Sequence, residues 1–567
     1  MVDSKKEIVA ELLSKEVNLS KEDVFKLLEK PKYSNLGDIS FPCFVLASIY
    51  KKNPFMVAQE VASRFEFAPE GFSKVQAIGG YVNFFYNNSM LAKQVLESIL
   101  YKKKKYGSSK IGKGKKIIID YSSPNIAKPM SIGHLRSTII GNSLYKIFSF
   151  QGYSCIGINY LGDYGTQFGK MLCAYDKWGK PLEEEMKKKP IETMLGLYVK
   201  FTEESEKNPA LEDEARAWFK KMEDGDKKAL ELWKTFRDLS IGDFKKFYDL
   251  LGVEFDVYSG ESQFKEKAKL VIERLKAQKI AVESEGAWLV PFGKDEAPLL
   301  IQKNDGASLY ATRDIAAAEE HFKKYKFYRK IYVVGTEQNI HFNHLFSTLQ
   351  RMGYPWAKNC VHVGFGMIYL PEGKISTRKG NLVFLEDVLQ RIFELTREFI
   401  DKDPKFSKKE KEKIAKAVGI SALIYGDLSN DRVKDIKFDW NRLLRLEGDS
   451  GPYIQYTYAR ASSIMKKEKV LQKLSSIPNM TKDEETLIKD LDSFPEVVEN
   501  AAEHYSSHII ANYLLRTADH FSTFYEKCPV LTAEKEVKAF RLHLTKAFAQ
   551  VMENGMLLLG MVPLKRM

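Results

Sequence analysis

The first group of residues suited to ligand binding and catalysis lies between Ile117 and Asn142, in the stretch IIIDYSSPNIAKPMSIGHLRSTIIGN. A β-branched run leads into a polar loop and then into a helical pattern that starts near Ser131. Backbone N–H groups and the dipole at such a helix start attract phosphate. Gly133 has no Cβ and would admit a flat ligand, and His134 could then reach a phosphate or ring oxygen. By itself, a Gly-His pair at a helix start is not specific to one family.

A second group of residues suits the binding of a triphosphate. The loop GKISTRKGN, Gly373–Asn381, carries Lys374, Arg378 and Lys379 around two hydroxyls and two glycines. In-line attack on an α-phosphate builds negative charge on the phosphate oxygens and on the leaving pyrophosphate, and positioned cations stabilise that charge. The alternative is a basic surface loop. The position of this loop after the first motif, on the far half of the same predicted sheet, favours the phosphate clamp.

A third group, Tyr310 and Asp314 in the string YATRD, could bind a guanidinium. A guanidinium has five donors in a fixed plane, so a carboxylate with a hydroxyl or aromatic partner holds it well. Four residues apart, the two side chains share one face if the segment is helical. The alternative is structural, with the tyrosine in a core and the acid as a cap.

Metal binding is not expected from the histidines. His341 and His344 form an HxxH pair that could lie on one helical turn, but no third ligand is near in the sequence. Packing or polarity beside a nucleotide is the interpretation for this pair, and packing is the interpretation for His362.

The elements that must position these groups read as an α/β core. Strand-like runs are Ile117–Ile119, Cys155–Asn159, Trp288–Pro291, Leu299–Gln302, Lys330–Val334 and Val361–Met367. They alternate with helical stretches such as Asp314–Lys323 and His341–Met352, which predicts a Rossmann-like parallel sheet covered on both faces. A charged, helical stretch from about Asp176 to Lys279 reads as an insertion between the two halves of the sheet.

Four domains follow from these patterns. Residues 1–112 form a predicted α+β domain, with helices at Lys5–Leu13 and Phe55–Phe65 and a strand at Gly80–Asn88. Residues 113–385 form the Rossmann-like domain, with the insertion at about 176–290. Residues 386–435 form a helical connecting segment, and 436–567 form an α-helical bundle.

Composition limits the class of protein. The chain has 567 residues, 44% of them hydrophobic, and a net charge of +13, which favours a polyanionic partner such as nucleic acid. Five cysteines lie far apart with no CxxC pair, which fits a reducing cytosol. The charged N-terminus shows no signal-peptide pattern, and no apolar run is long enough to span a membrane, so we expect a cytoplasmic protein without a membrane partner.

The last third could bind RNA. Phe438–Arg460 mixes flat rings with cations, and RNA bases stack on rings while arginines take phosphates. Many of these rings must also form the core of the bundle.

These motifs together resemble class I aminoacyl-tRNA synthetases, in the form seen in arginyl-tRNA synthetases. SPNIAKPMSIGHLRS resembles the HIGH signature, GKISTRKGN resembles the KMSKS signature, and LYATRDIAAA resembles the segment that selects arginine. The string GPYIQY and the terminal methionine after VPLKR are similar to the helical anticodon-binding domain of that family, and SNLGD and GYVNF to its N-terminal domain.

The resemblance implies roles for individual residues. Catalytic roles fall on Lys128, Ser131, His134, Lys374, Arg378 and Lys379. L-arginine would contact Asp120, Ser123, Asn125, His134, Tyr310, Asp314 and Gln338. ATP would contact Ser131, Gly133, His134, Gly364, Met367, Lys374, Ser376 and Lys379. The tRNA would contact Tyr81, Asn83, Phe85, Trp440, Arg442, Arg445, Tyr453, Tyr456, Arg460 and Met567.

The sequence departs from the family pattern at two positions. Ser131 stands where the family has the first histidine of HIGH, and Thr377 stands at the second lysine of KMSKS, whose role Lys128 would take over. A hydrogen bond to a charged group is worth roughly 1.5–3 kcal/mol, and the serine hydroxyl can still donate. Because serine is also a favoured N-cap residue, Ser131 would begin the helix.

The resulting hypothesis is an arginyl-tRNA synthetase that uses ATP with Mg²⁺, L-arginine and tRNA-Arg, acts as a monomer, and forms the adenylate only with tRNA bound. One alternative is a catalytically silent tRNA-binding paralogue, because of Ser131. Another is a small-substrate nucleotidylyltransferase, which shares the Gly-His helix start but needs no helical C-terminal domain. A different amino-acid specificity within class I is also open.

Overall fold

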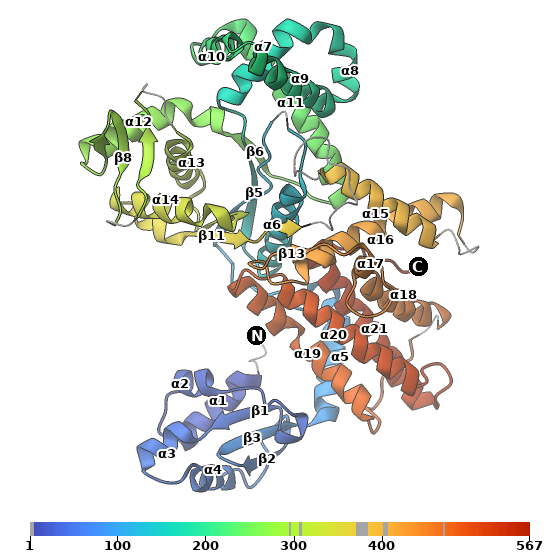
Figure 1. Cartoon of the computed structure of the whole chain (residues 1–567). Coiled ribbons are helices and arrows are strands. Elements are labelled where there is room, and N and C mark those ends of the chain that lie inside the picture. The colour runs from blue at the N-terminus through green and yellow to red at the C-terminus, as the bar shows by residue number, and fades with distance from the viewer. Residues whose placement is uncertain are drawn as a thin grey trace. The chain divides into compact units, whose positions relative to one another are not determined.

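The computed structural model describes residues 5–126, 128–293, 296–304, 309–369, 384–400, 406–468 and 471–567. The chain divides into two compact units. One comprises Met1–Lys103, Glu468–Asp492 and His520–Phe548, and the other comprises Lys104–Lys467, Ser493–Asp519 and Ala549–Met567. Figure 1 shows the elements of each unit. No helix in the described part of the chain is both long and apolar enough to cross a bilayer.

The first unit contains a three-stranded antiparallel sheet with the order β1-β3-β2. Its elements are α1 (Lys5–Glu16), α2 (Lys21–Leu27), η1 (Ser34–Leu36), β1 (Ile39–Pro42), α3 (Phe44–Tyr50), α4 (Pro54–Ser63), β2 (Phe72–Ile78), β3 (Tyr81–Tyr86) and α5 (Asn88–Lys102). Val9, Phe41, Val57 and Phe84 are buried in one core, which the helices and the sheet share. The predicted helices Lys5–Leu13 and Phe55–Phe65 and the strand Gly80–Asn88 are confirmed as α1, α4 and β3.

The second unit is built on a five-stranded sheet with the order β11-β10-β4-β5-β6. The strands are β4 (Lys116–Asp120), β5 (Ser154–Leu161), β6 (Val257–Gly260), β10 (Arg329–Gly335) and β11 (Cys360–Phe365), and every neighbouring pair is parallel. Ile117, Ile118 and Ile119 are all buried, because both faces of the central strand β4 are covered. The sheet that was predicted from the β-branched runs is therefore confirmed.

Helices cover both faces of this sheet. Ile118 and Ile158 share a core with α12 (Lys265–Ala277), α13 (Tyr310–Tyr325) and α14 (Asn339–Arg351). α6 (Ile132–Phe150) packs on β4, β5 and β10. In Figure 1, α13 and α14 lie on one side of the strands and α6 lies on the other. The carboxyl ends of the strands consequently meet the start of α6 and the start of α13 at one edge.

Two predicted strands belong to a different sheet. β8 (Ala287–Val290) and β9 (Leu299–Gln302) join β7 (Val282–Ser284) in a separate antiparallel sheet, so their assignment to the parallel sheet was wrong. Glu285 and Gly286 both have positive φ, at 53° and 77°, and close a two-residue hairpin between β7 and β8. β9 alternates buried and exposed residues, which is typical of an antiparallel sheet with one open face.

The charged stretch from about Asp176 to Lys279 is mostly helical, and β6 is the exception among its strands and helices. Its helices are the end of α7 (Thr166–Trp178), α8 (Glu183–Lys188), α9 (Pro190–Lys207), α10 (Ala210–Glu223), α11 (Lys227–Leu251) and α12, with η3 at Lys180–Leu182. The interpretation of the whole stretch as helical was wrong at β6, which adds the last strand to the parallel sheet. β6 has only four residues, too short a run for its period to register in the sequence.

From Glu386 onward, the described residues are mainly helical, as predicted. β12 (Ile368–Tyr369) pairs with β13 (Ile436–Lys437). The helices are α15 (Leu385–Ile400), α16 (Lys408–Leu428), α17 (Trp440–Leu443), α18 (Gly451–Lys467), α19 (Lys482–Glu503), α20 (His508–Lys527) and α21 (Lys535–Leu559). Short 3-10 turns lie at η2 (Lys103–Lys105), η4 (Glu261–Phe264), η5 (Thr336–Gln338) and η6 (Pro355–Asn359).

Candidate functional site

The loop after β4 has an unusual backbone that a buried network holds in place. Ser122 and Ser123 have φ values of 72° and 48°, which non-glycine residues rarely adopt. The Ser122 backbone N–H donates to Ser137 Oγ at 3.0 Å, and Ser122 Oγ lies 2.8 Å from the Tyr248 hydroxyl. Thr138 Oγ1 donates to Ser122 Oγ at 2.8 Å. Such strain persists only where the surroundings enforce it, and it gathers at functional sites.

The same loop orients two predicted arginine contacts, Ser123 and Asn125. Ser123 Oγ donates to Asp120 Oδ1 at 3.1 Å, and the Ser123 backbone N–H donates to Asn159 Oδ1 at 3.1 Å. Asn125 pairs with Gly162, which follows β5, and its side chain is exposed. Both residues thus lie at the carboxyl edge of the sheet, where open α/β sheets bind ligands.

The start of α6 places Ser131 and His134 together. Ser131 is the N-cap residue, as predicted, with φ −93° and ψ 170°. Its backbone N–H donates to His134 Nδ1 at 3.0 Å, and its Oγ lies 2.9 Å from the same nitrogen. Because Nδ1 accepts this backbone hydrogen bond, the neutral ring carries its proton on Nε2. Burial, together with the charge of Lys128, lowers the pKa of His134 to about 4, so the ring is a neutral donor at physiological pH.

Three carboxylates approach one another where β4, β6 and α13 meet. Asp120 ends β4, Glu261 follows β6 directly, and Asp314 lies in the first turns of α13. Burial raises the pKa of Asp120 to about 6, the positive charge of Lys330 opposes the rise, and the negative charge of Asp314 adds to it. Burial also raises the pKa of Glu261 to about 7, with Asp314 again contributing and Arg313 opposing. A positively charged ligand would stabilise the ionised forms of these buried acids, so the region is suited to bind a cation.

Two buried phenols line the same region. The hydroxyls of Tyr160 and Tyr332 are buried and have no hydrogen-bond partner within the described residues. Electrostatic interactions link each of them to Asp120 and Asp314. A buried hydroxyl without a partner is costly, so a ligand with several N–H donors would complete these groups.

The predicted pair Tyr310 and Asp314 lies on one helix, but the two side chains differ in exposure. Tyr310 is half exposed and its ring centroid lies 5.0 Å from that of His341. His341 Nε2 lies 2.7 Å from Asp314 Oδ2, which orients that carboxylate. Gln338, the last residue of η5, is exposed beyond the carboxyl end of β10.

His344 and His362 pack against aromatic rings, as the sequence suggested. The ring of His344 stacks on Phe292 with centroids 3.9 Å apart. His362 stacks on Phe342 at 4.4 Å, and its Nε2 lies 3.0 Å from the carbonyl oxygen of Val334. Among the described residues, no three His, Cys, Asp or Glu side chains are grouped as metal ligands.

The predicted phosphate clamp falls outside the described residues, which include none of Lys374, Ser376, Arg378 and Lys379. Its flanks are described. On one side, Gly364 lies in β11, Met367 follows that strand, and β12 ends at Tyr369. On the other side, Phe384 bridges to Ser131, and the Leu385 backbone N–H donates to the carbonyl oxygen of Met130 at 2.8 Å. The chain therefore returns from this loop directly beside the start of α6.

The predicted tRNA contacts are divided between surface and interior. In β3, Tyr81 and Phe85 are half-buried, while Asn83 is buried and donates to the carbonyl of Tyr81 at 3.2 Å.

In the C-terminal third, Arg460 lies over the Tyr456 ring at 4.8 Å and Arg442 pairs with Asp449. Trp440 is buried, Tyr453 is half-buried and Arg445 is exposed. Met567 packs against a small core that includes Ile400 and Ile414.

Sequence reasoning missed several residues of this region. Glu261, Tyr160, Tyr332, Asn159 and Tyr248 were not selected. The string SGES after the valine-tyrosine pair of β6 was the available signal for Glu261, because an acid just past a strand end faces the ligand edge. The tyrosines gave no local signal, since the fold alone brings them together.

Three protein-family descriptions match successive parts of the chain. The description "tRNA synthetases class I (R), catalytic domain" matches residues 95–440, "DALR anticodon binding domain" matches 454–567, and "Arginyl tRNA synthetase N terminal domain" matches 3–86. The arginine–tRNA ligase of Clostridium perfringens is 45% identical over 99% of this chain and 100% of its own length. That of Halothermothrix orenii is 45% identical over 99% of both chains.

Solved structures share the fold. The arginyl-tRNA synthetase of Thermus thermophilus has a TM-score of 0.81 at 23% identity over 99% of both chains. That of Plasmodium falciparum has a TM-score of 0.79 at 22% identity, covering 95% of this chain and 94% of its own. From the family matches and the identity over almost its full length, this chain belongs to the arginyl-tRNA synthetases, a class I family.

Proposed function

We propose that the protein joins L-arginine to tRNA-Arg with ATP, through an arginyl-adenylate. The observation that supports this most strongly is the group of three carboxylates at the same sheet edge as a neutral histidine at a helix start. The three carboxylates suit a cationic side chain, and the histidine at the helix start suits a phosphate. A substrate that carries its own carboxylate between the two would bring its nucleophile to the α-phosphate.

The guanidinium of arginine binds between Asp120, Glu261 and Asp314 in this proposal. Its planar donors can satisfy carboxylate oxygens and the hydroxyls of Tyr160 and Tyr332 together. The α-amino and carboxylate end lies towards Ser123, Asn125 and Gln338, which follow the ends of β4 and β10. Tyr310 covers the entrance.

ATP binds at the start of α6, where Gly133 gives room and His134 donates from Nε2. Lys128, Lys374, Ser376, Arg378 and Lys379 are proposed as its cationic and polar partners. Gly364 and Met367 supply backbone beside the base. These proposed ATP partners are mostly N–H groups and cations, not carboxylates. They fit an ATP whose Mg²⁺ would be held mainly by the phosphates. The ion would neutralise part of the phosphate charge.

The first of the two steps needs no general base from the protein, because the nucleophile is already a carboxylate. The arginine carboxylate attacks the α-phosphorus, the bond to the β-phosphate breaks, and pyrophosphate leaves with its electron pair. A ribose hydroxyl at the tRNA 3′ end then attacks the activated carbonyl carbon, and the bond from that carbon to the phosphate oxygen breaks. AMP leaves with the electron pair, and its phosphate can accept the hydroxyl proton. Positioning and charge stabilisation carry both steps.

The tRNA contacts the N-terminal and C-terminal parts of the chain in this proposal. Tyr81, Asn83 and Phe85 are assigned to one region. Trp440, Arg442, Arg445, Tyr453, Tyr456, Arg460 and Met567 are assigned to the other. The predicted domain ranges, a monomeric state and a cytoplasmic location are proposed with it. The net charge of +13 supports a nucleic-acid partner.

A charging panel tests this function. Purified protein, ATP with Mg²⁺ and 3′-labelled tRNA from the source are incubated with each of the twenty amino acids. We expect the labelled 3′ nucleotide to become aminoacylated only with arginine. Charging with another amino acid would reassign the specificity within class I, and tRNA binding without charging would indicate the silent paralogue.

A further inference from the structure

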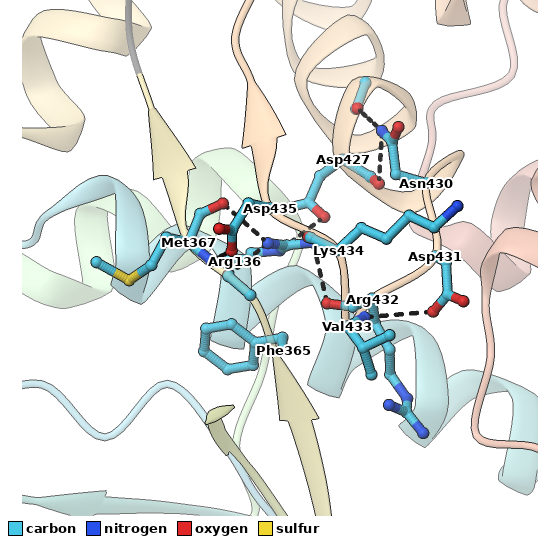
Figure 2. Close-up of polar contacts among 12 residues, drawn as sticks. Arg136, Phe365, Met367, Asp427, Asn430, Asp431, Arg432, Val433, Lys434 and Asp435 are labelled. Carbon is cyan, nitrogen blue, oxygen red and sulfur yellow. Dashed lines mark hydrogen bonds and ion pairs between the residues drawn. The ribbon is translucent and has the colours of Figure 1, made fainter. Parts of the chain in front are cut away.

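Arg136 is buried two residues beyond His134 on α6 and connects segments that are far apart in the chain. Its side chain is 1% exposed. Nη1 donates to the carbonyl oxygens of Gly366 and Met367, the latter at 3.3 Å. Nη2 donates to the carbonyl oxygens of Arg432 and Lys434 at 3.2 and 3.1 Å. Figure 2 shows the guanidinium between these segments. One planar group therefore joins α6, the end of β11 and the link before β13.

Asp427 of α16 supplies the opposite charge. Its Oδ1 lies 3.3 Å from Arg136 Nε, and its side chain is 6% exposed. Within the described residues, neither Arg136 Nε nor Asp427 Oδ2 has a hydrogen-bond partner of good geometry. The four carbonyl contacts therefore set the geometry of the guanidinium, and Asp427 balances its charge, which a buried cation requires.

The backbone that Arg136 holds is also held from the other side. Arg432 Nη1 donates to the carbonyl oxygen of Gly364 at 3.1 Å, and Asp435 Oδ1 accepts from the Met367 N–H at 2.7 Å. A Cβ at Gly366 would lie 2.6 Å from Asp435 Oδ1 and 2.8 Å from the carbonyl oxygen of Lys434. The backbone at Gly366 therefore packs closely against Lys434 and Asp435, and hydrogen bonds from Arg136 tie it to α6.

We propose that Arg136 is a positioning residue for ATP, with Asp427 as its counter-charge. It fixes the backbone of Gly364–Met367 relative to the helix start that carries His134, so that base and phosphates meet one rigid surface. This inference rests on the proposed function, which assigns ATP contacts to both segments. A misplacement of about 1 Å in such a site is enough for a loss of roughly 100-fold.

Arg136→Lys tests the proposal. Lysine keeps the charge, but its compact ammonium cannot reach carbonyls on both sides as the guanidinium fork does. We expect the dissociation constant of ATP, measured by calorimetry on the full chain, and the KM for ATP to rise at least ~10-fold. The KM for arginine and the dissociation constant of tRNA should stay within about twofold.

Arg541→Lys is the matched control, because Arg541 forms another buried pair, with Glu484 at 2.7 Å. It should lower the melting temperature about as much as Arg136→Lys and leave ATP binding unchanged. Equal rises in the ATP and arginine constants of Arg136→Lys, or unchanged ATP constants, would overturn the proposal.

Two further variants keep the test decisive. If Arg136→Lys does not fold, Gly366→Ala is the alternative, because its added methyl group would displace the same backbone. It should raise the dissociation constant and the KM for ATP and leave the KM for arginine unchanged. Asp427→Asn removes the charge but leaves the carbonyl contacts, so it should lower the melting temperature with an ATP KM within about threefold. Wild-type protein without any exchange activity would refute the proposed function instead, and ATP binding by calorimetry would still report on Arg136.

Discussion

Ser131 and His134 share one hydrogen-bonding arrangement, and this explains how a serine can stand at the start of the signature. The Ser131 backbone N–H, which any residue provides, fixes His134 Nδ1 at 3.0 Å. The ligand-facing donor is then His134 Nε2. The side chain of Ser131, at the N-cap of the helix, adds a second contact to the same nitrogen at 2.9 Å.

This arrangement predicts unequal effects of two substitutions. His134→Asn keeps an acceptor near the Ser131 N–H but removes the Nε2 donor, so the rate of ATP–pyrophosphate exchange should fall by about 10- to 100-fold. Ser131→Ala should lower it by less than ~10-fold. Urea unfolding of both variants serves as the control for folding. A larger loss with Ser131→Ala than with His134→Asn would contradict this assignment.

The raised pKa values of Asp120 and Glu261 predict how arginine binding depends on pH. Burial sets these pKa values at about 6 and about 7, so both acids lose their protons between pH 5.5 and 8. Arginine stays cationic in this range and binds the ionised forms. The KM for arginine should therefore fall as pH rises from 5.5 to 8, by about fourfold if Asp120 must ionise and by about 30-fold if Glu261 must ionise.

Measurement of KM for arginine and for ATP from pH 5.5 to 8 checks this expectation. Glu261→Gln should raise the arginine KM and flatten its pH profile, because one titrating group is lost. A KM for arginine that rises with pH would show that the carboxylates do not hold the guanidinium.

At the scale of elements, the contact between the β4 loop and the end of β5 decides where Asn125 points. A Cβ at Gly162 would lie 2.1 Å from Asn125 Oδ1, the flexible end of that side chain. Gly162→Ala should therefore displace the carboxamide without unfolding the loop.

We expect Gly162→Ala to raise the KM for arginine by about tenfold, roughly one charge-assisted hydrogen bond, with the KM for ATP unchanged. Gly196→Ala is the matched control, because nothing lies within 4 Å of a Cβ at that helix position. Equal KM values for arginine in the two variants would remove Asn125 from the site.

The network under the same loop makes a prediction about stability. The Tyr248 hydroxyl contacts Ser122 Oγ at 2.8 Å and accepts from Asn159 Nδ2 at 2.9 Å. Tyr248→Phe would leave these buried groups short of a partner and should destabilise the protein by about 1–3 kcal/mol.

Tyr160→Phe is the comparison, because the Tyr160 hydroxyl has no protein partner among the described residues. It should not destabilise the fold and should raise the KM for arginine. Urea unfolding and steady-state kinetics separate the two effects. Destabilisation by Tyr160→Phe equal to that by Tyr248→Phe would argue against an open polar site around Tyr160.

The sequence predicted those elements whose own side chains carry the signal. The isoleucines of β4 are buried on both faces, so their continuous apolar run was sufficient to identify a central strand. β8 and β9 show the limit of this reasoning, because an apolar run does not reveal which strand it pairs with. The turn at Glu285 and Gly286 decides that pairing locally, and β6 was too short to be recognised.

The site residues could be predicted from the sequence only where they lie on one continuous segment. Ser123, Asn125, Ser131 and His134 lie on one continuous segment, so the sequence could group them. Glu261 and Tyr332 reach the same region from strands that are distant in the chain, and only the order of the sheet brings them together. Arg136 falls within the signature itself, but the carbonyls that it holds belong to residues about 230 and 300 positions later.

The whole molecule combines a catalytic domain with regions that match the N-terminal and anticodon-binding domains of tRNA synthetases. The five-stranded sheet positions the groups proposed for arginine and ATP, and the chain adds an N-terminal α+β region and a long helical region to it. A nucleotidylyltransferase acting on small molecules alone would need neither region. The matches over the catalytic, N-terminal and anticodon-binding parts agree with this composition.

ATP–pyrophosphate exchange with L-arginine, run with and without tRNA from the source, is the decisive measurement for the proposed activity. We predict exchange with arginine when tRNA is present, and none with tRNA and no amino acid. Folded protein that binds tRNA but shows no exchange with arginine under either condition would contradict the account.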